Sequence, residues 1–380
     1  MENSERKSVV HIGPFSGSGG MAHVVNLVRK YKQETDLLSW CEVDSNPTDT
    51  LRGSVITRSV ASILISLEII QCINKEKRRG GVPITHIHTS SYAGFYEKIF
   101  FVLIARSLGS HVILHIHGGA FNQFFEENSR VTKELISRLL LLPDRLIVLS
   151  EWWANFLRER VNPELEGRMT VLHNAVEVPN LSLDRLMRAR SESEQFRIVF
   201  LGSVGDRKGC RELLGAADQL SDHSDIQIHF LGGGEQDGDL ERYKAKGRDM
   251  GLSNVHFPGY VSGDQKADHL KQADLFVLPS RADNFPISLL EAMSYGLPVV
   301  VSDVGAMEEV VSEENGIVIA PRDIDALVKA IQFMYHHPEK RKEMGHENIK
   351  TVTNNYSAKK YIKNIKSIYT KIDSLDKHII

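Results

Sequence analysis

The stretch SRADNFPISLLEAMSYGLPVV, Ser280–Val300, contains a loop, a helix and the start of a strand in quick succession. Pro286 lacks a backbone N–H and disfavours the helical conformation at Phe285, so the helix is predicted to begin after the proline. The Gly-Leu-Pro sequence that follows ends the helix, which is therefore predicted to run from Ile287 to Ser294. The valines after it predict a buried strand.

Two carboxylates, Asp283 and Glu291, lie on either side of this predicted helix start. Asp283 falls in the loop, and Glu291 falls one to two turns into the helix. The backbone N–H groups of a first helical turn lack partners within the helix and attract anions. The segment is therefore a candidate seat for a diphosphate beside two acidic side chains.

The same alternation of short apolar runs and helical stretches extends over both halves of the chain, and it predicts parallel sheets covered by helices. We therefore expect an α/β fold with two doubly wound domains, at 1–178 and 196–355, joined by a polar linker at 179–195. The predicted strands are 9–13, 84–89, 112–117, 145–150, 169–176, 197–202, 226–232, 254–259, 274–280, 298–303 and 316–320. Ligands of such folds bind beyond the carboxyl ends of the strands.

Two loops next to predicted strands are suited to anions. Arg207 and Lys208 follow one strand and precede a helix, and a guanidinium with an ammonium suits a diphosphate leaving group. A glycine-rich loop ending in Gly19 and Gly20 precedes another helix. That loop lacks the lysine of a Walker loop and the downstream acid of a dinucleotide fingerprint, so a nicotinamide dehydrogenase is not expected.

The segment around Glu291, with Ala292-Met293 and Gly296-Leu297-Pro298-Val299 after it, resembles the E-x7-E signature of retaining GT-B glycosyltransferases of family 4. The first acid is Asp283 where that family usually has glutamate. The resemblance covers nearly the whole chain and implies two Rossmann-like domains that face a central cleft. It also implies an acceptor-side first domain, a donor-binding second domain, and final helices, 356–380, that cross back to the first domain.

The resemblance assigns roles to individual residues. It implies that His117, Asp283 and Lys208 are catalytic, with His117 and Asp283 positioning the transferred sugar. Glu291 would accept hydrogen bonds from the ribose hydroxyls. The family often has an arginine where this chain has Ser203, so Arg207 is expected to compensate. The implied donor-binding residues are Gly19, Gly20, Arg207, Lys208, Gly233, Glu235, Tyr260, Asn284, Phe285 and Glu291.

Histidines occur as two H-x-H pairs, His86 with His88 and His115 with His117. Two such pairs could indicate a metal site, but no cysteine or acid nearby completes a tetrahedral ligand set. Ordinary hydrogen bonds between neighbouring strands are the alternative. We expect no metal and no cofactor other than the nucleotide-sugar co-substrate.

The composition is that of a globular protein, and a net charge of −3 over 380 residues gives no reason to expect nucleic acid as a partner. The three cysteines, Cys41, Cys72 and Cys210, predict neither a disulfide framework nor a metal site, which favours a reducing cytoplasm. The N-terminus lacks a signal-peptide core, and no apolar run is long enough to span a bilayer. The segment 151–160, rich in tryptophan and arginine, predicts either peripheral contact at the inner membrane face or packing against the first sheet.

The sequence thus favours a glycosyltransferase that moves a sugar from a UDP- or GDP-sugar to a hydroxyl of a glycan or lipid-linked acceptor, as in surface polysaccharide biosynthesis. Two alternatives share the fold. One is a nucleotide-sugar epimerase, and the other is a non-catalytic partner subunit that binds sugar nucleotides. The departures at Asp283 and Ser203 motivate the second alternative, whereas the retained cations and Glu291 favour the transferase.

Overall fold

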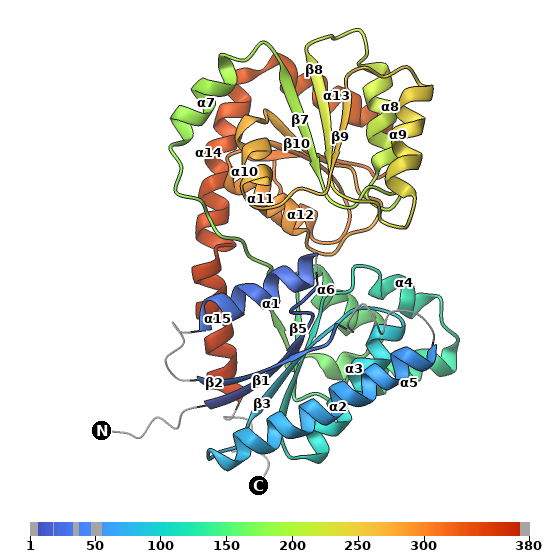
Figure 1. Ribbon diagram of the computed structural model, residues 1–380, viewed down its shortest axis with the longest axis vertical. Coiled ribbons are helices and arrows are strands. Elements are labelled where there is room, and N and C mark those ends of the chain that lie inside the picture. Colours follow the sequence, from blue (N-terminus) through green and yellow to red (C-terminus); the bar gives the residue numbers. More distant parts are fainter. Residues whose placement is uncertain (1–6, 18, 33–37, 47–54, 373–380) are drawn as a thin grey trace. The chain divides into compact units, whose positions relative to one another are not determined.

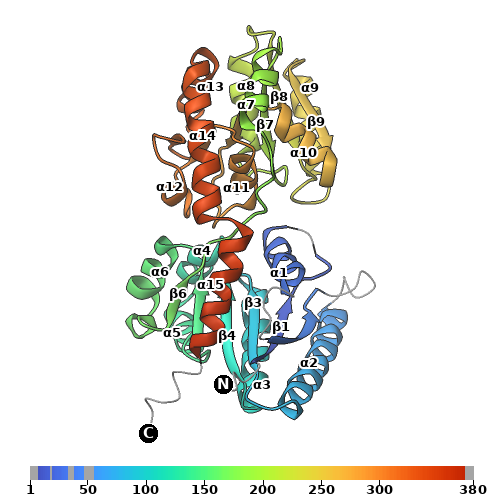
Figure 2. The ribbon, with the colours of Figure 1, turned by 90° about the vertical axis from the view of Figure 1, so that its left-hand side faces the viewer.

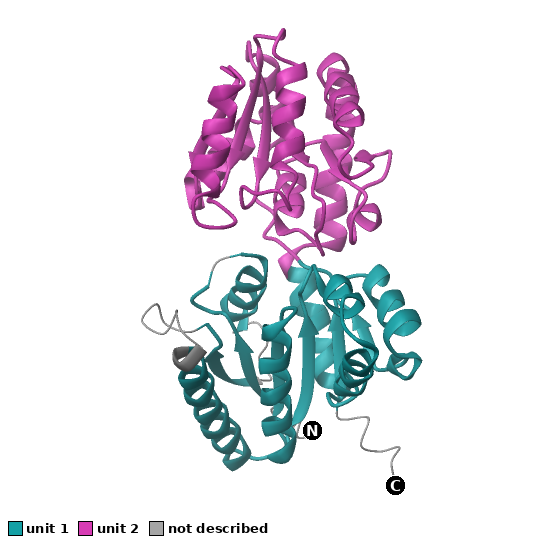
Figure 3. Cartoon of the chain, turned by 90° about the vertical axis from the view of Figure 1, so that its right-hand side faces the viewer, with its two compact units in different colours: residues 1–174, 359–380 teal, residues 175–358 magenta. Residues whose placement is uncertain are grey.

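A computed structural model describes residues 7–17, 19–32, 38–46 and 55–372. The chain divides into two compact units (Figures 1 and 3). Unit 1 comprises Met1–Asn174 with Lys359–Ile380, and unit 2 comprises Ala175–Ala358. Each unit contains one six-stranded parallel sheet with helices between its strands, which confirms the predicted α/β class.

The sheet of unit 1 has the strand order β2-β1-β3-β4-β5-β6, and all neighbouring strands are parallel. Its strands are β1 (Lys7–Gly13), β2 (Leu38–Asp44), β3 (Ile84–Thr89), β4 (His111–Ile116), β5 (Arg145–Val148) and β6 (Met169–Val171). The accompanying helices are α1 (Gly20–Lys30), α2 (Val55–Arg78), α3 (Ala93–Ser107), α4 (Phe121–Glu126), α5 (Arg130–Leu139), α6 (Glu151–Phe156) and α15 (Ala358–Lys371).

Strand β3 lies between β1 and β4 and is buried at every position. Strands of a parallel sheet covered on both faces are usually continuous apolar runs. In β3, however, Thr85, His86, His88 and Thr89 are polar. Their burial requires hydrogen-bond partners on neighbouring strands, and this requirement shapes the histidine cluster described below.

The last described helix, α15, packs against the sheet of unit 1 (Figure 2). Its Tyr369 is 1% exposed and lies edge-on to Trp40 of β2, with 6.2 Å between ring centroids. The Tyr369 hydroxyl lies 2.7 Å from His86 Nδ1 on β3. The C-terminal segment thereby contributes a side chain to the core of unit 1.

Cys41 of β2 and Cys72 of α2 form a disulfide, with their Cα atoms 5.8 Å apart. The expectation that the cysteines are unpaired is therefore wrong for these two. They are 31 residues apart in sequence and meet only because α2 packs beside β2, which no local pattern reveals. Cysteine usage consequently no longer argues for a reducing compartment. Cys210 is free and buried.

The sheet of unit 2 has the order β12-β11-β10-β7-β8-β9, again with all neighbours parallel. Its strands are β7 (Phe196–Leu201), β8 (Ile226–Leu231), β9 (Val255–Gly259), β10 (Leu275–Leu278), β11 (Val299–Ser302) and β12 (Gly316–Ile319). The helices are α7 (Leu183–Ser191), α8 (Cys210–Gln219), α9 (Asp239–Asp249), α10 (Gly263–Gln272), α11 (Ile287–Ser294), α12 (Met307–Val310), α13 (Ile324–His336) and α14 (Pro338–Asn355).

The segment expected to be a linker, 179–195, contains helix α7, which is fixed to unit 2. Arg190 of this helix is 9% exposed, and its guanidinium donates hydrogen bonds to four backbone carbonyls. Burial lowers the pKa of Arg190 to about 10, so the group is still charged at neutral pH. The acceptors are the carbonyls of Leu270, Lys271, Tyr295 and Gly296.

Among the described helices, none is both long and apolar enough to cross a membrane. In the tryptophan-rich segment, Trp153 is 2% exposed and Leu157 is fully buried, so both pack into the core of unit 1. Trp152 is 39% exposed and stacks on Phe156 with 5.8 Å between ring centroids. Packing against the sheet therefore accounts for two of the residues considered for membrane contact, whereas Trp152 lies at the surface.

Candidate functional site

The carboxyl ends of β7 and β10 mark the switch point of the sheet in unit 2. These strands are neighbours, but the chain proceeds from β7 to β8 and β9 on one side and from β10 to β11 and β12 on the other. The loops after two such strands leave in opposite directions, and the crevice between them is where doubly wound folds bind ligands. The loops concerned are 202–209 and 279–286.

The loop after β7 lies in close contact with the loop after β10. Gly209 adopts φ +74°, and a Cβ atom there would lie 1.8 Å from the carbonyl oxygen of Pro279. Only glycine meets both conditions without displacing backbone. The N–H of Arg281 also donates to the carbonyl of Arg207 at 2.8 Å. The first turn of α8 therefore begins directly beside the second loop.

Lys208 and Asp283, one from each loop, form an ion pair with 2.5 Å between Nζ and Oδ2. The two side chains are 12% and 11% exposed, so water screens the pair only weakly. Asp283 Oδ2 also accepts from the hydroxyl of Ser280, and Oδ1 accepts from the N–H of Asn284, both at 3.2 Å. The carboxylate is thus held by three donors and neutralises the cation that would otherwise face the crevice.

A second pair joins Arg207 to Glu235 of the loop after β8. Backbone hydrogen bonds fix this loop to the loop after β7, from Val204 N–H to the carbonyl of Gly233 at 2.7 Å and from Glu235 N–H to the carbonyl of Val204 at 2.9 Å. Arg207 is 42% exposed, so its guanidinium can turn toward an anion at modest cost.

Glu291 is the fifth residue of α11, about 6 Å along the helix axis from the helix start. Its Oε1 lies 2.6 Å from Nζ of Lys266, which α10 supplies. The side chains are 16% and 28% exposed. Lys266 was not expected from the sequence, because its meeting with Glu291 depends on how α10 and α11 pack.

The loop after β11 closes over the Asp283 segment. Gly305 adopts φ +61°, and a Cβ atom there would lie 2.3 Å from the carbonyl oxygen of Asp283. The N–H of Ala306 donates to the carbonyl of Asn284 at 3.0 Å. Phe285 is 3% exposed and packs on Tyr356 with 5.5 Å between centroids, so its side chain is part of the core.

The remaining predicted residues of unit 2 differ in their surroundings. Gly233 has open space around the position of a Cβ atom, as expected for a backbone that a ligand can approach. Tyr260 follows the edge strand β9 and is 71% exposed. Hydrogen bonds and ion pairs therefore join Arg207, Lys208, Glu235 and Asp283 in one network, while Tyr260 lies at the edge of the sheet.

A further pair that the sequence did not indicate supports the base of the network. Arg281 pairs with Glu212 of α8 at 2.6 Å, and the glutamate side chain is 6% exposed. The pair joins the loop after β10 to the helix that follows Lys208. It thereby supports the position of that loop.

In unit 1, the predicted residues lie at the carboxyl ends of β1 and β4. Gly19 precedes α1 and adopts φ +97°, a conformation that favours glycine, and Gly20 is the first residue of that helix. His117 directly follows β4, and its Nε2 lies 2.8 Å from Nδ1 of His88 on β3.

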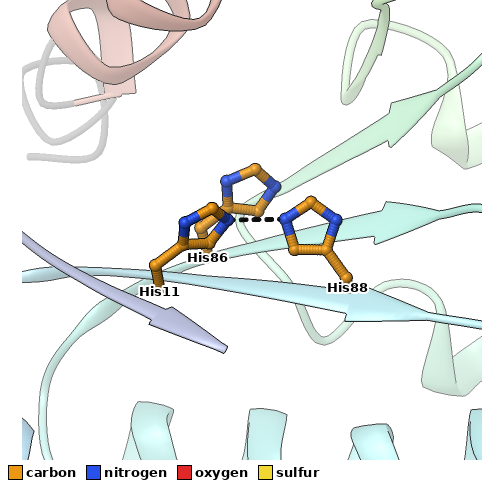
Figure 4. A group of neighbouring side chains, drawn as sticks. All are labelled: His11, His86 and His88. Carbon is orange, nitrogen blue, oxygen red and sulfur yellow. Dashed lines mark hydrogen bonds between the residues drawn. The ribbon is translucent and has the colours of Figure 1, made fainter. Parts of the chain in front are cut away.

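His117 belongs to a cluster of five histidines on three neighbouring strands, of which Figure 4 shows His11, His86 and His88. Nε2 of His11 lies 2.6 Å from Nε2 of His88, and Nε2 of His86 lies 3.3 Å from Nδ1 of His115. Burial lowers the pKa of His11 and of His117 to about 3 and holds the other three well below the usual value. All five imidazoles are therefore neutral at neutral pH. His11 was not expected from the sequence.

Residues 186–351, nearly all of unit 2, match the family model described as Glycosyl transferases group 1. An uncharacterized glycosyltransferase of Methanocaldococcus jannaschii is 24% identical over 94% of the chain and 96% of its own length. The D-rhamnosyltransferase WbpZ of Pseudomonas aeruginosa is 28% identical over 57% of the chain and 56% of its own length.

Solved structures extend the likeness to both units of the chain. Sucrose-phosphate synthase from Thermosynechococcus elongatus matches with a TM-score of 0.74 and 18% identity, over 97% of the chain and 100% of that protein. HepE of Anabaena, solved in complex with UDP, matches with a TM-score of 0.74 and 14% identity, over 96% and 100%. These likenesses show the fold, which is the GT-B fold of two Rossmann-like units.

Proposed function

We propose that the chain is a retaining glycosyltransferase of family 4. It would move a sugar from a UDP- or GDP-sugar to a hydroxyl of a glycan or lipid-linked acceptor in surface polysaccharide biosynthesis. The observation that carries the proposal is the network at the switch point of unit 2, where Lys208, Arg207 and the start of α8 lie beside Asp283. The structural neighbour HepE, solved in complex with UDP and with UDP-glucose, supports the donor class.

Each polar group at the switch point has a role in the proposal. The diphosphate would displace the carboxylates of Asp283 and Glu235 and form ion pairs with Lys208 and Arg207. It would also accept hydrogen bonds from the backbone N–H groups at the start of α8. Asp283, released from Lys208, would accept hydrogen bonds from hydroxyls of the sugar. Glu291, released from Lys266, would accept them from the ribose.

The transfer step is proposed from the resemblance to retaining glycosyltransferases. The bond between the anomeric carbon and the phosphate oxygen breaks, and its electron pair goes to the leaving diphosphate. The cations and helix N–H groups stabilise the charge that develops there. The acceptor oxygen forms the new bond on the same face of the sugar, and its proton passes to the leaving phosphate oxygen. His117 of unit 1 is proposed to position the sugar.

In this scheme the side-chain cations neutralise the diphosphate, so the transfer itself is proposed to need no metal ion. A bound divalent cation commonly fills that role in other phosphate sites. The donor-binding residues proposed for unit 2 are Arg207, Lys208, Gly233, Glu235, Tyr260, Asn284, Phe285 and Glu291, with Gly19 and Gly20 from unit 1.

A peripheral membrane location is a further part of the proposal, with the chain in the cytoplasm at the inner membrane face. Helices α2 and α3 pack together and expose apolar side chains that support it. Each of these residues is at least 44% exposed: Val60, Ile63, Leu64, Leu67, Phe100 and Leu103. The protein is expected to float with anionic liposomes at low salt, and recovery in the unbound fraction would contradict this part alone.

Donor turnover tests the function. With UDP- and GDP-sugars, the wild type is expected to release the nucleoside diphosphate slowly to water even without the acceptor. Proton NMR should show that the freed sugar first appears with the anomeric configuration of the donor. Lys208→Met should reduce release at least tenfold, whereas Lys271→Met, on the surface of α10, should not. First appearance of the opposite anomer would exclude the retaining mechanism.

A further inference from the structure

The five-histidine cluster arises from the register of three strands. His11 pairs in register with His86, and His88 pairs with His115. Residues two apart on a strand point to the same face, so both H-x-H pairs project their rings from one side of the sheet. The sequence showed the two pairs separately, whereas the structure places them opposite each other.

Three of these histidines, His88, His115 and His117, converge closely enough to hold one ion. Each offers one ring nitrogen, and these atoms lie within 4.8 Å of one another. The ring centroids are 4.1–5.0 Å apart. In a tetrahedral site with metal–nitrogen bonds of about 2.0–2.1 Å, ligand nitrogens lie about 3.3 Å apart. The 2.8 Å between His88 Nδ1 and His117 Nε2 would therefore widen by about 0.5 Å on binding.

An unpartnered atom at the same place points independently to a ligand. His115 is fully buried, and within the described part of the chain its Nε2 has no hydrogen-bond partner. A buried polar atom left in this state is costly, and such atoms in proteins usually indicate a missing water, ion or ligand. The other ring nitrogen of His115 is already engaged by His86.

The remaining contacts orient the rings of His88 and His115 as the outer contacts of a metal site do. His88 Nε2–H can donate to His11 Nε2, and His115 Nδ1–H can donate to His86 Nε2. His86 Nδ1–H can then donate to the hydroxyl of Tyr369. With these tautomers every ring is neutral, and the lone pairs of His88 Nδ1 and His115 Nε2 are both available to a cation.

We propose that His88 Nδ1, His115 Nε2 and His117 Nε2 bind one zinc-class divalent cation, with the fourth position open to water. Three imidazoles without a carboxylate suit zinc, cobalt, nickel or copper and do not suit magnesium or calcium. His117 is half-buried at the end of β4, so the ion can enter from that side. The sequence predicted no metal because no cysteine or acid completes a set of four ligands. A zinc site with three protein ligands and water in the fourth position does not need a fourth side chain, so the proposal replaces that expectation.

The three ligands lie in unit 1, apart from the donor network of unit 2, and only His117 is shared with the residues proposed to act in transfer. The competing account is that the histidines only share protons. In the unbound cluster, His117 Nε2–H would donate to His88 Nδ1, and this hydrogen bond alone accounts for the 2.8 Å distance between the two nitrogens. Because the two accounts differ in whether a metal displaces that proton, metal binding itself decides between them.

Cobalt(II) is a suitable probe, because a tetrahedral site gives it strong visible d–d absorption. The chelator-treated chain of 380 residues should bind one equivalent of cobalt(II) with that spectrum, and equimolar Zn²⁺ should displace it. His115→Gln should abolish the spectrum. The matched control, His111→Gln at the start of the same strand, should retain it. Absence of a tetrahedral spectrum in the wild type, or its persistence in His115→Gln, would overturn the proposal.

If His115→Gln does not fold, the variant His86→Gln and X-ray absorption of the wild type still test the proposal. His86→Gln removes only an outer contact and should weaken cobalt binding by roughly 10-fold to 100-fold, as outer contacts of metal ligands usually do. X-ray absorption of the zinc-loaded wild type should show three imidazole ligands. Fewer than three would reject the assigned site. Both measurements report metal binding and not sugar transfer, so a failure of the metal proposal can be told apart from a failure of the proposed function.

Discussion

Replacing Lys208 by methionine removes the ammonium that pairs with Asp283 and keeps most of the side-chain length. Removing one partner of a buried ion pair typically costs about 3–5 kcal/mol, because the other charge is left with little water. The pair of Lys208 and Asp283 counts as buried, since its side chains are 12% and 11% exposed. Asp283 retains two donors, from Ser280 and Asn284, each at 3.2 Å. We therefore expect a smaller loss of about 2 kcal/mol in the unfolding free energy of unit 2.

Hydrogen–deuterium exchange of the buried amides in β7 and β10 measures this loss in unit 2 itself, which matters because a chain with two units need not unfold in one step. Lys208→Met with Asp283→Asn should recover about half of the loss, since no buried charge then remains. The surface control Lys271→Met, paired with Asp268, should change stability by less than about 0.5 kcal/mol. Equal effects of Lys208→Met and Lys271→Met would refute the reasoning.

Three further outcomes follow from the geometry. Gly209→Ala should destabilise unit 2 by about 3 kcal/mol, from the left-handed φ of +74° and a Cβ atom 1.8 Å from a backbone carbonyl. The control Gly251→Ala has φ +71° and open space, so its cost, measured by the same exchange experiment, should be only about 1 kcal/mol. Lys266→Met frees Glu291 from its ion pair and should tighten nucleotide binding a few-fold by calorimetry; weaker binding would contradict competition for that carboxylate. Burial lowers the pKa of His11 in the folded state to about 3, so the unfolded chain takes up this proton first as the pH falls below about 6.5. The free energy of unfolding therefore decreases as the pH is lowered further. Thermal melting of metal-free protein should therefore fall from pH 7 to pH 5, less steeply for His11→Gln, and an unchanged slope would argue against this origin.

The strands of unit 2 could be predicted because their signals are local. Apolar runs bounded by glycine and proline gave all six, and α11 was predicted with the bounds that the structure shows. In unit 1 the edge strand β2 was missed, since LSWCEVD carries a cysteine and two acids and lacks a continuous apolar run. The last strand was predicted too long, because the apolar residues after Val171 leave the sheet.

The pairings could not be predicted, because they depend on the strand order and not on the spacing along the chain. Lys208 and Asp283 meet only because β7 and β10 are neighbours. The disulfide of Cys41 needs α2 to pack beside β2. His11 joins the other histidines because β1 lies next to β3. In each case the residue types were visible in the sequence and their partners were not.

Calorimetric titration with UDP, GDP and ADP, on the wild type and on Glu291→Ala, tests the central claim most directly. The account predicts selective binding of UDP or GDP that is lost in Glu291→Ala. Binding should be retained in Glu241→Ala, whose glutamate pairs with Lys244 on the surface of α9. No binding of any nucleotide, or binding that Glu291→Ala leaves unchanged, would contradict the assignment of the donor site to the switch point of unit 2.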